Sequence, residues 1–395
     1  MHVLSISTLF PNPVRPLFGI FVGNQMRAVT RRGDVDLTMI SPNGIPPWPL
    51  YLREPYASLR GMPETSDISG LQVRYPRFTT IPVIGGDSNP GRVVRAILPL
   101  ARKLHSRAPF DLVDASFFFP DGPAAATIAR ELGLPLTIKA RGADIHHWGA
   151  RPKALRQMLA AAHQASALLA VSEALKRDMA ALGMPEDRIA VHYTGVDHQR
   201  FTPTDRETAR HRIAEEPSLA IPRDGTLLVS TGALIERKGQ KYAIEALTTL
   251  PDTRLALAGS GADESQLRDL AANLGLSGRV HFLGSVGHDL MPVLLSAADA
   301  MVLPSASEGL ANAWVEALAC GTPLIIPDVG GAREVLKDAS AGRIAGRDAR
   351  EIAAAVRSLL ADLPAQSAVA ANAAAFSWEA NAGRLVEIWR GACTD

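Results

Sequence analysis

Short runs of apolar and β-branched residues alternate with longer helical patterns along the whole chain, and this alternation constrains the fold most strongly. Parallel strands that are buried on both faces read as continuous apolar runs, and they need helical crossovers between them. The sequence therefore predicts an α/β fold with parallel sheets covered by helices on both faces. The predicted strands are Val3–Ser7, Val35–Ile40, Gln72–Tyr75, Leu112–Ala115, Leu136–Lys139, Leu168–Val171, Ile189–Tyr193, Leu227–Ser230, Arg254–Ala258, Val280–Leu283, Ala300–Leu303 and Pro323–Ile326.

The pattern breaks once, in a polar stretch around residues 198–225 that holds three prolines and has no strand run. A chain of 395 residues has the length of two domains. We predict an N-terminal domain over residues 1–198, an interdomain linker over 199–225 and a C-terminal domain over 226–376. Residues 377–395 follow as a terminal helix.

Composition and charge exclude several classes of protein. The chain has 47% hydrophobic and 21% charged residues, which is ordinary for a globular protein. Its net charge is only +1, so its overall electrostatic field would not attract nucleic acid. Its two cysteines, Cys320 and Cys393, have no metal-ligand spacing and form no disulfide framework. The sequence shows no signal-peptide pattern and no apolar run of roughly 18 residues. We expect a cytoplasmic protein whose membrane contact, if any, is peripheral at the inner face.

The strongest candidate site follows the predicted strand that ends at Leu303. Ligands of open parallel sheets bind at the carboxyl ends of the strands. Here a loop of small residues leads into a helix that begins near Leu310. Unpaired backbone N–H groups at a helix start suit phosphate. The phosphate-binding candidates at this junction are Gly309, Leu310, Ala311 and Asn312.

Two glutamates accompany this helix start. Glu308 lies in the loop, and Glu316 lies four residues after Asn312 on the same helical face. A carboxylate accepts hydrogen bonds from two vicinal hydroxyls, so one glutamate can hold a sugar and the other a ribose. Two acids at this spacing are common in proteins, but their place at a strand-to-helix junction favours a functional role.

Two other strand ends carry groups that suit an anion. Ser230–Gly239 contains the adjacent cations Arg237 and Lys238, and a pyrophosphate leaving group needs fixed positive charge as its bond breaks. An Arg-Lys pair elsewhere would be an ordinary solvated pair. The proline-rich stretch Ser7–Gly19 is too long for a simple turn, and Gly19 opens a helix whose N–H groups can meet an anion or a sugar. A plain surface loop is the alternative there.

Polar groups also follow two strands of the first half, within Phe117–Gly122 and Lys139–Trp148. Because they follow strands, we expect them at the ligand-binding edge of the sheet. A histidine pair is structural in most proteins, and its position here leaves the structural and functional interpretations open. The candidates in these two stretches are Phe118, Asp121, Arg141, Asp144, His146 and His147.

Neither a metal nor a bound cofactor is predicted. Asp34-Val35-Asp36 mimics a metal-binding Asp-x-Asp motif, but it stands at the start of a strand and away from the predicted site. The glycine-rich Ala258–Gly261 follows a strand, but Glu264 occupies the third position of a dinucleotide fingerprint. We interpret that stretch as a packing turn.

Together these residues resemble the family-four group of retaining glycosyltransferases with the GT-B fold, over nearly the whole chain. Glu308 and Glu316 look like that family's two glutamates separated by seven residues. Further matches are Gly232, Arg237, Lys238 and Gly239 of its Gly…Arg-Lys-Gly segment, and Thr194-Gly195-Val196-Asp197 with Phe201, where Thr194 replaces the usual Asn. Where many members have His-Gly-x-Asp, this chain has Arg141-Gly142-Ala143-Asp144, a version found in members that build bacterial surface polysaccharides of the teichuronic acid or exopolysaccharide type.

The resemblance implies two Rossmann-like domains whose parallel sheets face a central cleft, the first binding the acceptor and the second the nucleotide sugar. The terminal helix would cross back onto the first domain. Arg237 and Lys238 would bind the donor diphosphate, while Glu316 would hold the ribose. Glu308 would contact the transferred sugar, and the Gly19 loop would line the cleft from the other side. Arg141 and Asp144 would be catalytic, with Phe118, Asp121, His146 and His147 on the acceptor side; whether Arg141 or a histidine lies nearest the anomeric carbon stays open.

We therefore predict a retaining, metal-independent enzyme that moves a sugar from a nucleoside diphosphate sugar to a glycan, lipid-linked or small-molecule hydroxyl in cell-surface polysaccharide synthesis. No residue stands out as a nucleophile, which favours a front-face substitution in which the diphosphate takes the acceptor proton. A nucleotide-sugar epimerase or phosphorylase on the same fold and a non-catalytic nucleotide-sugar-binding subunit stay open as alternatives. The sequence does not determine the donor or the acceptor.

An anionic membrane surface is a further candidate partner. A helical pattern between residues 92 and 107 combines five cations with apolar residues, and Ile45–Leu52 is an unusually apolar loop. Basic amphipathic helices lie on anionic bilayers. An ordinary surface helix packed on the sheet is the alternative.

Overall fold

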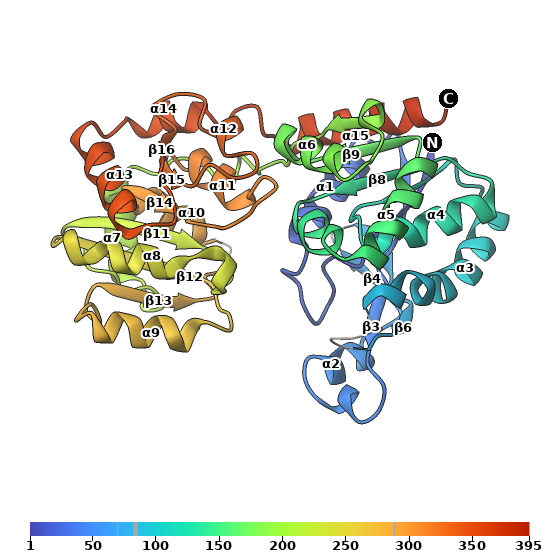
Figure 1. Cartoon of the computed structure of the whole chain (residues 1–395), viewed down its shortest axis with the longest axis horizontal. Coiled ribbons are helices and arrows are strands. Elements are labelled where there is room, and N and C mark those ends of the chain that lie inside the picture. The colour runs from blue at the N-terminus through green and yellow to red at the C-terminus, as the bar shows by residue number, and fades with distance from the viewer. Residues whose placement is uncertain (69, 82–85, 288, 395) are drawn as a thin grey trace. The chain divides into compact units, whose positions relative to one another are not determined.

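The computed structural model describes residues 1–68, 70–81, 86–287 and 289–394, and the chain forms two units (Figure 1). The first unit is Met1–Gly195 with Trp378–Asp395, and the second is Val196–Ser377. The segment 199–225, which we predicted as a linker, lies in the second unit and contains α7 (Arg206–Glu215). This helix is polar along most of its length, but Ala209 and Ile213 are buried four residues apart and Asp205 caps its start, which explains why a helix forms there.

The first unit is built on an eight-stranded sheet in the order β10-β9-β8-β7-β1-β2-β5-β4. Its strands pair in parallel except for β4 and β5 at one edge, which form an antiparallel pair that we did not predict. Gly70, at φ 87°, and its hydrogen bond to Asp67 explain the tight reversal between these two strands. The strands are β10 (Ile189–Val191), β9 (Ala167–Ala170), β8 (Leu136–Ala140), β7 (Leu112–Ala115), β1 (His2–Ile6), β2 (Asp36–Ile40), β5 (Leu71–Arg74) and β4 (Thr65–Ile68), with a separate parallel pair β3 (Asn43–Ile45) and β6 (Arg77–Thr79).

Two sets of helices cover this sheet. Helices α1 (Ile20–Arg31) and α15 (Trp378–Ala392) contact each other, and their buried side chains belong to one hydrophobic core cluster with residues of the sheet. Helices α3 (Asn89–Arg107), α4 (Asp121–Leu132) and α5 (Pro152–Gln164) lie side by side, and α4 packs on β7 and β8 (Figure 1). The remaining helices are α2 (Tyr56–Gly61), α6 (Glu173–Ala181) and the π-helix η3 (Asp144–Trp148), with the short 3-10 turns η1 (Leu50–Leu52), η2 (Gly86–Ser88) and η4 (Glu186–Arg188).

The terminal helix α15 is held in the first unit by polar contacts as well as by packing. The Trp389 indole N–H donates to Asp114 Oδ1 at 3.1 Å, inside the core. His192 Nε2 lies 2.8 Å from the Asn381 carbonyl oxygen, and Arg390 pairs with Asp34 at 2.8 Å. The contact between Asp114 and Trp389 joins a strand and a helix that are 275 residues apart.

The second unit has a six-stranded parallel sheet in the order β13-β12-β11-β14-β15-β16. Its buried leucines, isoleucines and valines form one core with the helices on its faces. The strands are β13 (Val280–Gly284), β12 (Thr253–Ala258), β11 (Thr226–Thr231), β14 (Ala300–Val302), β15 (Leu324–Ile326) and β16 (Gly342–Ile344). The other helices of this unit are α8 (Gln240–Ala246), α9 (Glu264–Asn273), α10 (Met291–Ala297), α11 (Asn312–Ala319), α12 (Ala332–Val335), α13 (Ala349–Ala361) and α14 (Gln366–Ala371), with the turns η5 (Glu236–Lys238) and η6 (Leu247–Thr249).

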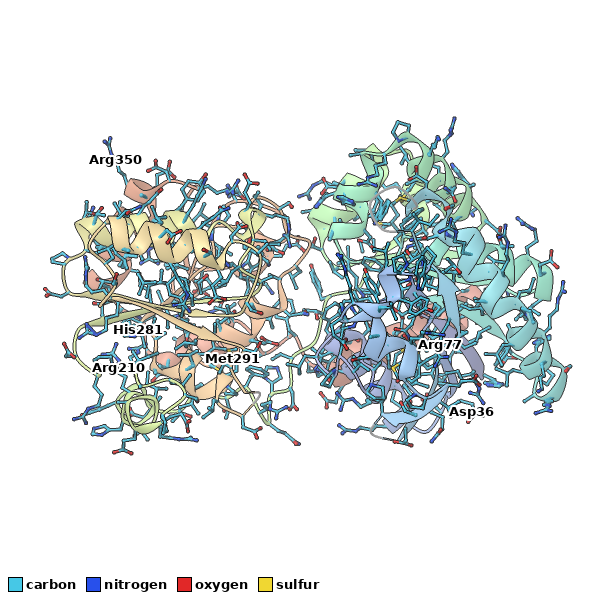
Figure 2. The ribbon with its side chains drawn as sticks, turned by 90° about the horizontal axis from the view of Figure 1, so that it is seen from below. Asp36, Arg77, Arg210, His281, Met291 and Arg350 are labelled. Carbon is cyan, nitrogen blue, oxygen red and sulfur yellow. The ribbon has the colours of Figure 1, made fainter. Side chains whose placement is uncertain are left out.

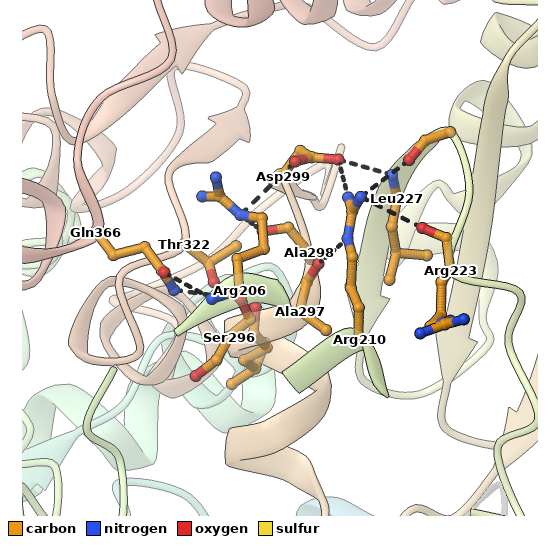
Figure 3. A network of polar contacts seen from close by, with 12 residues as sticks. Arg206, Arg210, Arg223, Leu227, Ser296, Ala297, Ala298, Asp299, Thr322 and Gln366 are labelled. Atoms are coloured by element: carbon orange, nitrogen blue, oxygen red, sulfur yellow. Dashed lines mark hydrogen bonds and ion pairs between the residues drawn. The ribbon is translucent and has the colours of Figure 1, made fainter. Parts of the chain in front are cut away.

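Charged side chains lie on the outside of the second unit, where Arg350 of α13 projects into solvent (Figure 2). A polar network at the amino ends of β11 and β14 joins α7 to the sheet (Figure 3). Asp299 accepts from Arg210 at 2.5 Å and from the Leu227 backbone N–H at 2.8 Å, and Arg206 lies 3.6 Å away. The amino ends of these two strands thus serve to attach α7 to the sheet.

Two observations bear on contact with a membrane. Among the residues that the structure describes, no helix is long and apolar enough to cross a bilayer. The apolar loop that follows β3 is exposed, with Trp48 at 72% and Leu52 at 63% of their full accessible surface.

Candidate functional site

The carboxyl ends of β11 and β14 bring two distant segments of the second unit together. The strands are neighbours in the sheet, so the loops that follow them share one edge. The Ala306 backbone N–H donates to the Arg237 carbonyl oxygen at 2.7 Å, and Arg237 Nη1 donates to the Ser307 carbonyl oxygen at 2.5 Å. These contacts place the Arg237-Lys238 pair directly beside the loop before α11.

Three charged groups meet at this edge. Lys238 Nζ lies 2.5 Å from Glu308 Oε1, and Arg237 Nη1 lies 3.4 Å from the same oxygen. The side chains of Lys238 and Glu308 are only 14% and 10% exposed, whereas Arg237 is more open. Two cations around one carboxylate leave a net positive charge at the edge of the sheet, which suits an anion.

Glycines set the shape of these loops. A Cβ on Gly239, at φ 70°, would lie 2.3 Å from the Pro304 carbonyl oxygen. A Cβ on Gly259 would lie 1.9 Å from the Gly232 carbonyl oxygen, so Ala258–Gly261 packs tightly on the end of β11. The loop around Glu308 sits equally close to Gly330, where a Cβ would lie 2.1 Å from the Glu308 carbonyl oxygen. The two ends of the candidate site are therefore held by backbone contacts that only glycine permits.

The start of α11 lies next to the charged cluster along the chain. Ala311 occupies the cap position without a side-chain cap, and Leu310 and Ala311 are buried. The Gly331 N–H donates to the Gly309 carbonyl oxygen at 2.7 Å, which ties the loop to the turn after β15. The start of α11 at Asn312 follows Glu308 by four residues, and the positive end of a helix dipole suits a phosphate.

Glu316 lies one turn further along α11. Burial raises the pKa of its carboxyl to about 7. Within the described ranges, no protein group makes a hydrogen bond or ion pair with this carboxyl. A half-buried carboxyl group without a protein partner is suited to accept hydrogen bonds from a ligand.

In the first unit, Asp144 organises the loops that follow β7 and β8. Its carboxylate accepts from the backbone N–H groups of Phe118, Arg141 and Gly142, each at 2.9 Å. The Ile145 N–H adds a fourth donor at 3.1 Å. Four backbone donors satisfy a buried carboxylate, so Asp144 fixes the positions of Phe118 and Arg141.

Arg141 is held inside the unit by polar and aromatic contacts. Its Nε donates to the Ser116 carbonyl oxygen at 2.7 Å, its Nη2 donates to Gln25 Oε1 at 3.2 Å, and its guanidinium lies 5.0 Å from the Phe21 ring centre. Burial lowers its pKa to about 10, so it stays charged at neutral pH. Gln25 Oε1 also accepts from Lys139 Nζ at 3.2 Å.

Lys139 and His192 complete a buried network that the sequence did not reveal. Lys139 Nζ lies 2.7 Å from His192 Nδ1. Burial and the nearby Arg141 charge lower the pKa of Lys139 well below its usual value, and burial also lowers the pKa of His192. A lysine at the end of an apolar strand gives no signal of such partners, because they come from residues 25 and 192.

The other first-unit candidates, Asp121, His146 and His147, differ in burial and in the residues that they contact. Asp121 is fully buried at the start of α4, where its Oδ2 accepts from the Thr8 N–H at 2.7 Å. Its Oδ1 is buried without a hydrogen-bond partner, and burial raises the pKa of Asp121 to about 7. His146 instead bonds Asp178 of α6 at 2.9 Å, and His147 is exposed beside Trp148.

Gly19 begins α1 with a left-handed backbone, at φ 66°. A Cβ there would lie 2.6 Å from the Leu9 carbonyl oxygen, so the helix start presses against the loop after β1. The structure thus gathers Phe118, Arg141 and Asp144 around one loop pair, whereas His146 pairs with Asp178 and His147 lies exposed beside Trp148. Within the described part of the chain, no group of three or more His, Cys, Asp or Glu side chains could hold a metal ion.

The fold and the charged cluster together indicate a class of enzyme. Two α/β units with parallel sheets, and a positive cluster at a sheet edge, have the architecture of GT-B glycosyltransferases. Solved structures share it: sucrose-phosphate synthase from Thermosynechococcus elongatus has a TM-score of 0.78 at 19% identity, covering 99% of this chain and 98% of that one. HepE from Anabaena, solved in complex with UDP, has a TM-score of 0.72 at 21% identity, covering 98% and 99%.

Sequence comparisons identify the family. Residues 20–200 match the model of Glycosyltransferase Family 4, and residues 211–376 match that of Glycosyl transferases group 1. The chain belongs to these glycosyltransferases, as the sequence predicted. It is 29% identical to a putative teichuronic acid biosynthesis glycosyltransferase, TuaC, of Bacillus subtilis, over 84% of this chain and 82% of that protein. It is 35% identical to a D-inositol 3-phosphate glycosyltransferase of Geodermatophilus obscurus, over 54% of this chain and about half, 49%, of that relative.

Proposed function

We propose that this glycosyltransferase transfers a sugar from a nucleoside diphosphate sugar to an acceptor hydroxyl, with retention of anomeric configuration and without a divalent metal. The observation that carries the proposal is the cluster of Arg237, Lys238 and Glu308 at the carboxyl edge of the second sheet. Its excess positive charge comes from side chains that the fold holds in place. Such preorganised charge is what a departing diphosphate needs.

In this proposal the donor lies along the loops of the second unit. Arg237 and Lys238 bind the diphosphate, and the ion pairs that they now make with Glu308 loosen as the phosphates arrive. The backbone of Gly232 and of the α11 start, from Gly309 to Asn312, approaches the phosphate oxygens. Glu316 accepts from the ribose hydroxyls, and Glu308 accepts from a hydroxyl of the transferred sugar.

The proposed reaction breaks the bond between the anomeric carbon and the phosphate oxygen. The bonding pair leaves with the diphosphate, where the two cations and the α11 dipole stabilise the growing negative charge. The acceptor oxygen attacks from the same face, and the departing diphosphate takes its proton. This front-face route needs no protein nucleophile.

We place acceptor recognition in the first unit. Asp121 has a buried oxygen without a partner, and Asp144 holds Phe118 and the charged Arg141 in fixed positions. Gly19 would present the start of α1 to the reacting sugar, and His146 and His147 would contact the more distant part of the acceptor. The likeness to the teichuronic acid relative supports a glycan or lipid-linked acceptor in surface polysaccharide synthesis.

The test is a donor screen in the presence of EDTA. UDP-, GDP- and ADP-sugars are incubated with the protein and with a panel of lipid-linked and soluble acceptors, and nucleoside diphosphate release is measured. NMR of the product then gives its anomeric configuration. Transfer that requires an added divalent metal, or a product of inverted configuration, would overturn the proposal.

A further inference from the structure

The three helices α3, α4 and α5 carry a strong excess of positive charge. Together they hold eight Arg and Lys side chains and two carboxylates, and one of these, Asp121, is buried. Helix α3 alone has five cations and no acid along its 19 residues. The whole chain has a net charge of only +1, so this charge is concentrated on one part of the molecule.

The exposed cations of these helices form one surface. The helices lie side by side in the first unit, with α4 between α3 and α5 (Figure 1). Along α3 the exposed positions recur every three to four residues, which places them on one side of the helix. We call the exposed set the basic face: Arg95, Arg102, Lys103, Arg107, Arg130, Lys153 and Arg156.

Within the three helices little negative charge balances the basic face, although Asp87, just before α3, lines a pocket with Lys153 and Arg156. Glu131 is the exposed acid of the three helices, and it pairs with Arg102 at 2.5 Å. A groove of about 490 Å³ runs between the helices and is lined by Arg95 and Arg130 together with small residues. An anionic group that enters this groove meets cations from two helices.

The apolar side of α3 is already used by the fold. Val93 and Ile97 are completely buried in the first unit, so α3 cannot insert an apolar stripe into a bilayer in the way that an interfacial helix does. Any attraction of the basic face to a membrane must therefore be electrostatic. Such attraction reaches about one Debye length and weakens as salt is added.

We propose that the basic face docks this protein on the anionic headgroups of a phospholipid membrane. A helix of 19 residues is about 28 Å long, so the face presents its cations to many headgroups at once. The three helices contain no Phe, Tyr or Trp. Surfaces that bind single-stranded nucleic acid usually combine cations with stacked aromatics, which favours the lipid. The proposal is independent of the sugar-transfer reaction proposed above.

The experiment compares two charge reversals on the full chain. Arg95→Glu/Lys103→Glu changes α3, and Arg350→Glu/Arg357→Glu changes two exposed arginines of α13 by the same total charge. Binding to phosphatidylcholine vesicles with and without phosphatidylglycerol is measured by co-sedimentation at about 0.1 M salt, where the Debye length is about 10 Å. Thermal melting checks that both variants fold.

The wild type should bind the vesicles that contain phosphatidylglycerol, release them at about 1 M salt and ignore pure phosphatidylcholine. The α3 variant should bind at least about tenfold more weakly, while the α13 variant binds as the wild type does. Equal losses in both variants would mean that net charge alone is responsible. Failure of the wild type to bind anionic vesicles, or a preference for nucleic acid over these vesicles, would also overturn the proposal.

Discussion

Replacing Lys238 by alanine tests the proposed donor site most sharply. At about 4 Å and an effective dielectric constant of about 20, one charge stabilises a developing unit charge by roughly 4 kcal/mol. Arg237 and the α11 dipole remain in the variant and offset part of this loss. We therefore expect a loss of about 2 to 3 kcal/mol, or roughly 30- to 150-fold in kcat, in line with the removal of one preorganised donor elsewhere.

The same change leaves Glu308 with Arg237 alone, at 3.4 Å. A largely buried carboxylate that loses a partner costs about 1 to 3 kcal/mol of stability. The added change Glu308→Gln should restore the melting temperature, which shows whether the lost ion pair limits the stability of the single variant. The assay is nucleoside diphosphate release at saturating donor, with Lys241→Ala, an exposed lysine of α8, as the matched control. A Lys238→Ala enzyme that keeps kcat within a factor of three of the wild type would refute the reasoning.

Three other predictions follow from single contacts. Gly239→Ala forces a Cβ to within 2.3 Å of a backbone oxygen, whereas Gly275→Ala, the control, places a Cβ in open space at the same φ of 70°. Urea unfolding should show that the free energy of unfolding falls by at least about 3 kcal/mol for Gly239→Ala and by about 1 kcal/mol for Gly275→Ala. Equal losses in the two variants would contradict the close packing at Gly239. Because the native pKa of Asp121 is about 7 and its unfolded value about 4, the native state holds a proton that the unfolded state releases, so the free energy of unfolding should fall as pH rises from about 4 to 7. Melting curves of Asp121→Asn should lose that dependence in part, and an unchanged pH slope would argue against a raised pKa. Gln25→Leu removes a hydrogen-bond acceptor of Arg141 and should lower kcat about tenfold with little change in KM for the donor, and a change confined to KM would exclude a positioning role.

The two stretches that meet in the second unit could be predicted because parallel topology reduces each of them to a local pattern at a strand end. Lys238 and Glu308 are 70 residues apart, yet both follow strands, and neighbouring parallel strands bring their carboxyl ends to one edge. The same rule anticipated the loops that hold Arg141 and Asp144 in the first unit.

The features that the sequence did not reveal depend on partners from distant segments. Lys139 ends an apolar strand, and its contacts with Gln25 and His192 arise only when three separate elements pack. Helix α7 has just two buried residues in a polar stretch, too few for a recognisable apolar period. Strand β5 was predicted, as Gln72–Tyr75, but its antiparallel partner β4 was missed because the sequence of Thr65–Ile68 is mostly polar and has no apolar run.

We propose that protein cations at the carboxyl ends of the second sheet's strands, rather than a metal, hold the nucleoside diphosphate. Calorimetric titration of the nucleoside diphosphate into the protein, in EDTA, measures this directly. We expect binding by the wild type and a loss of at least about 30-fold in affinity for Arg237→Ala/Lys238→Ala, since two charge-assisted contacts disappear. Equal affinity of the two proteins, or binding that appears only after a divalent metal is added, would contradict it.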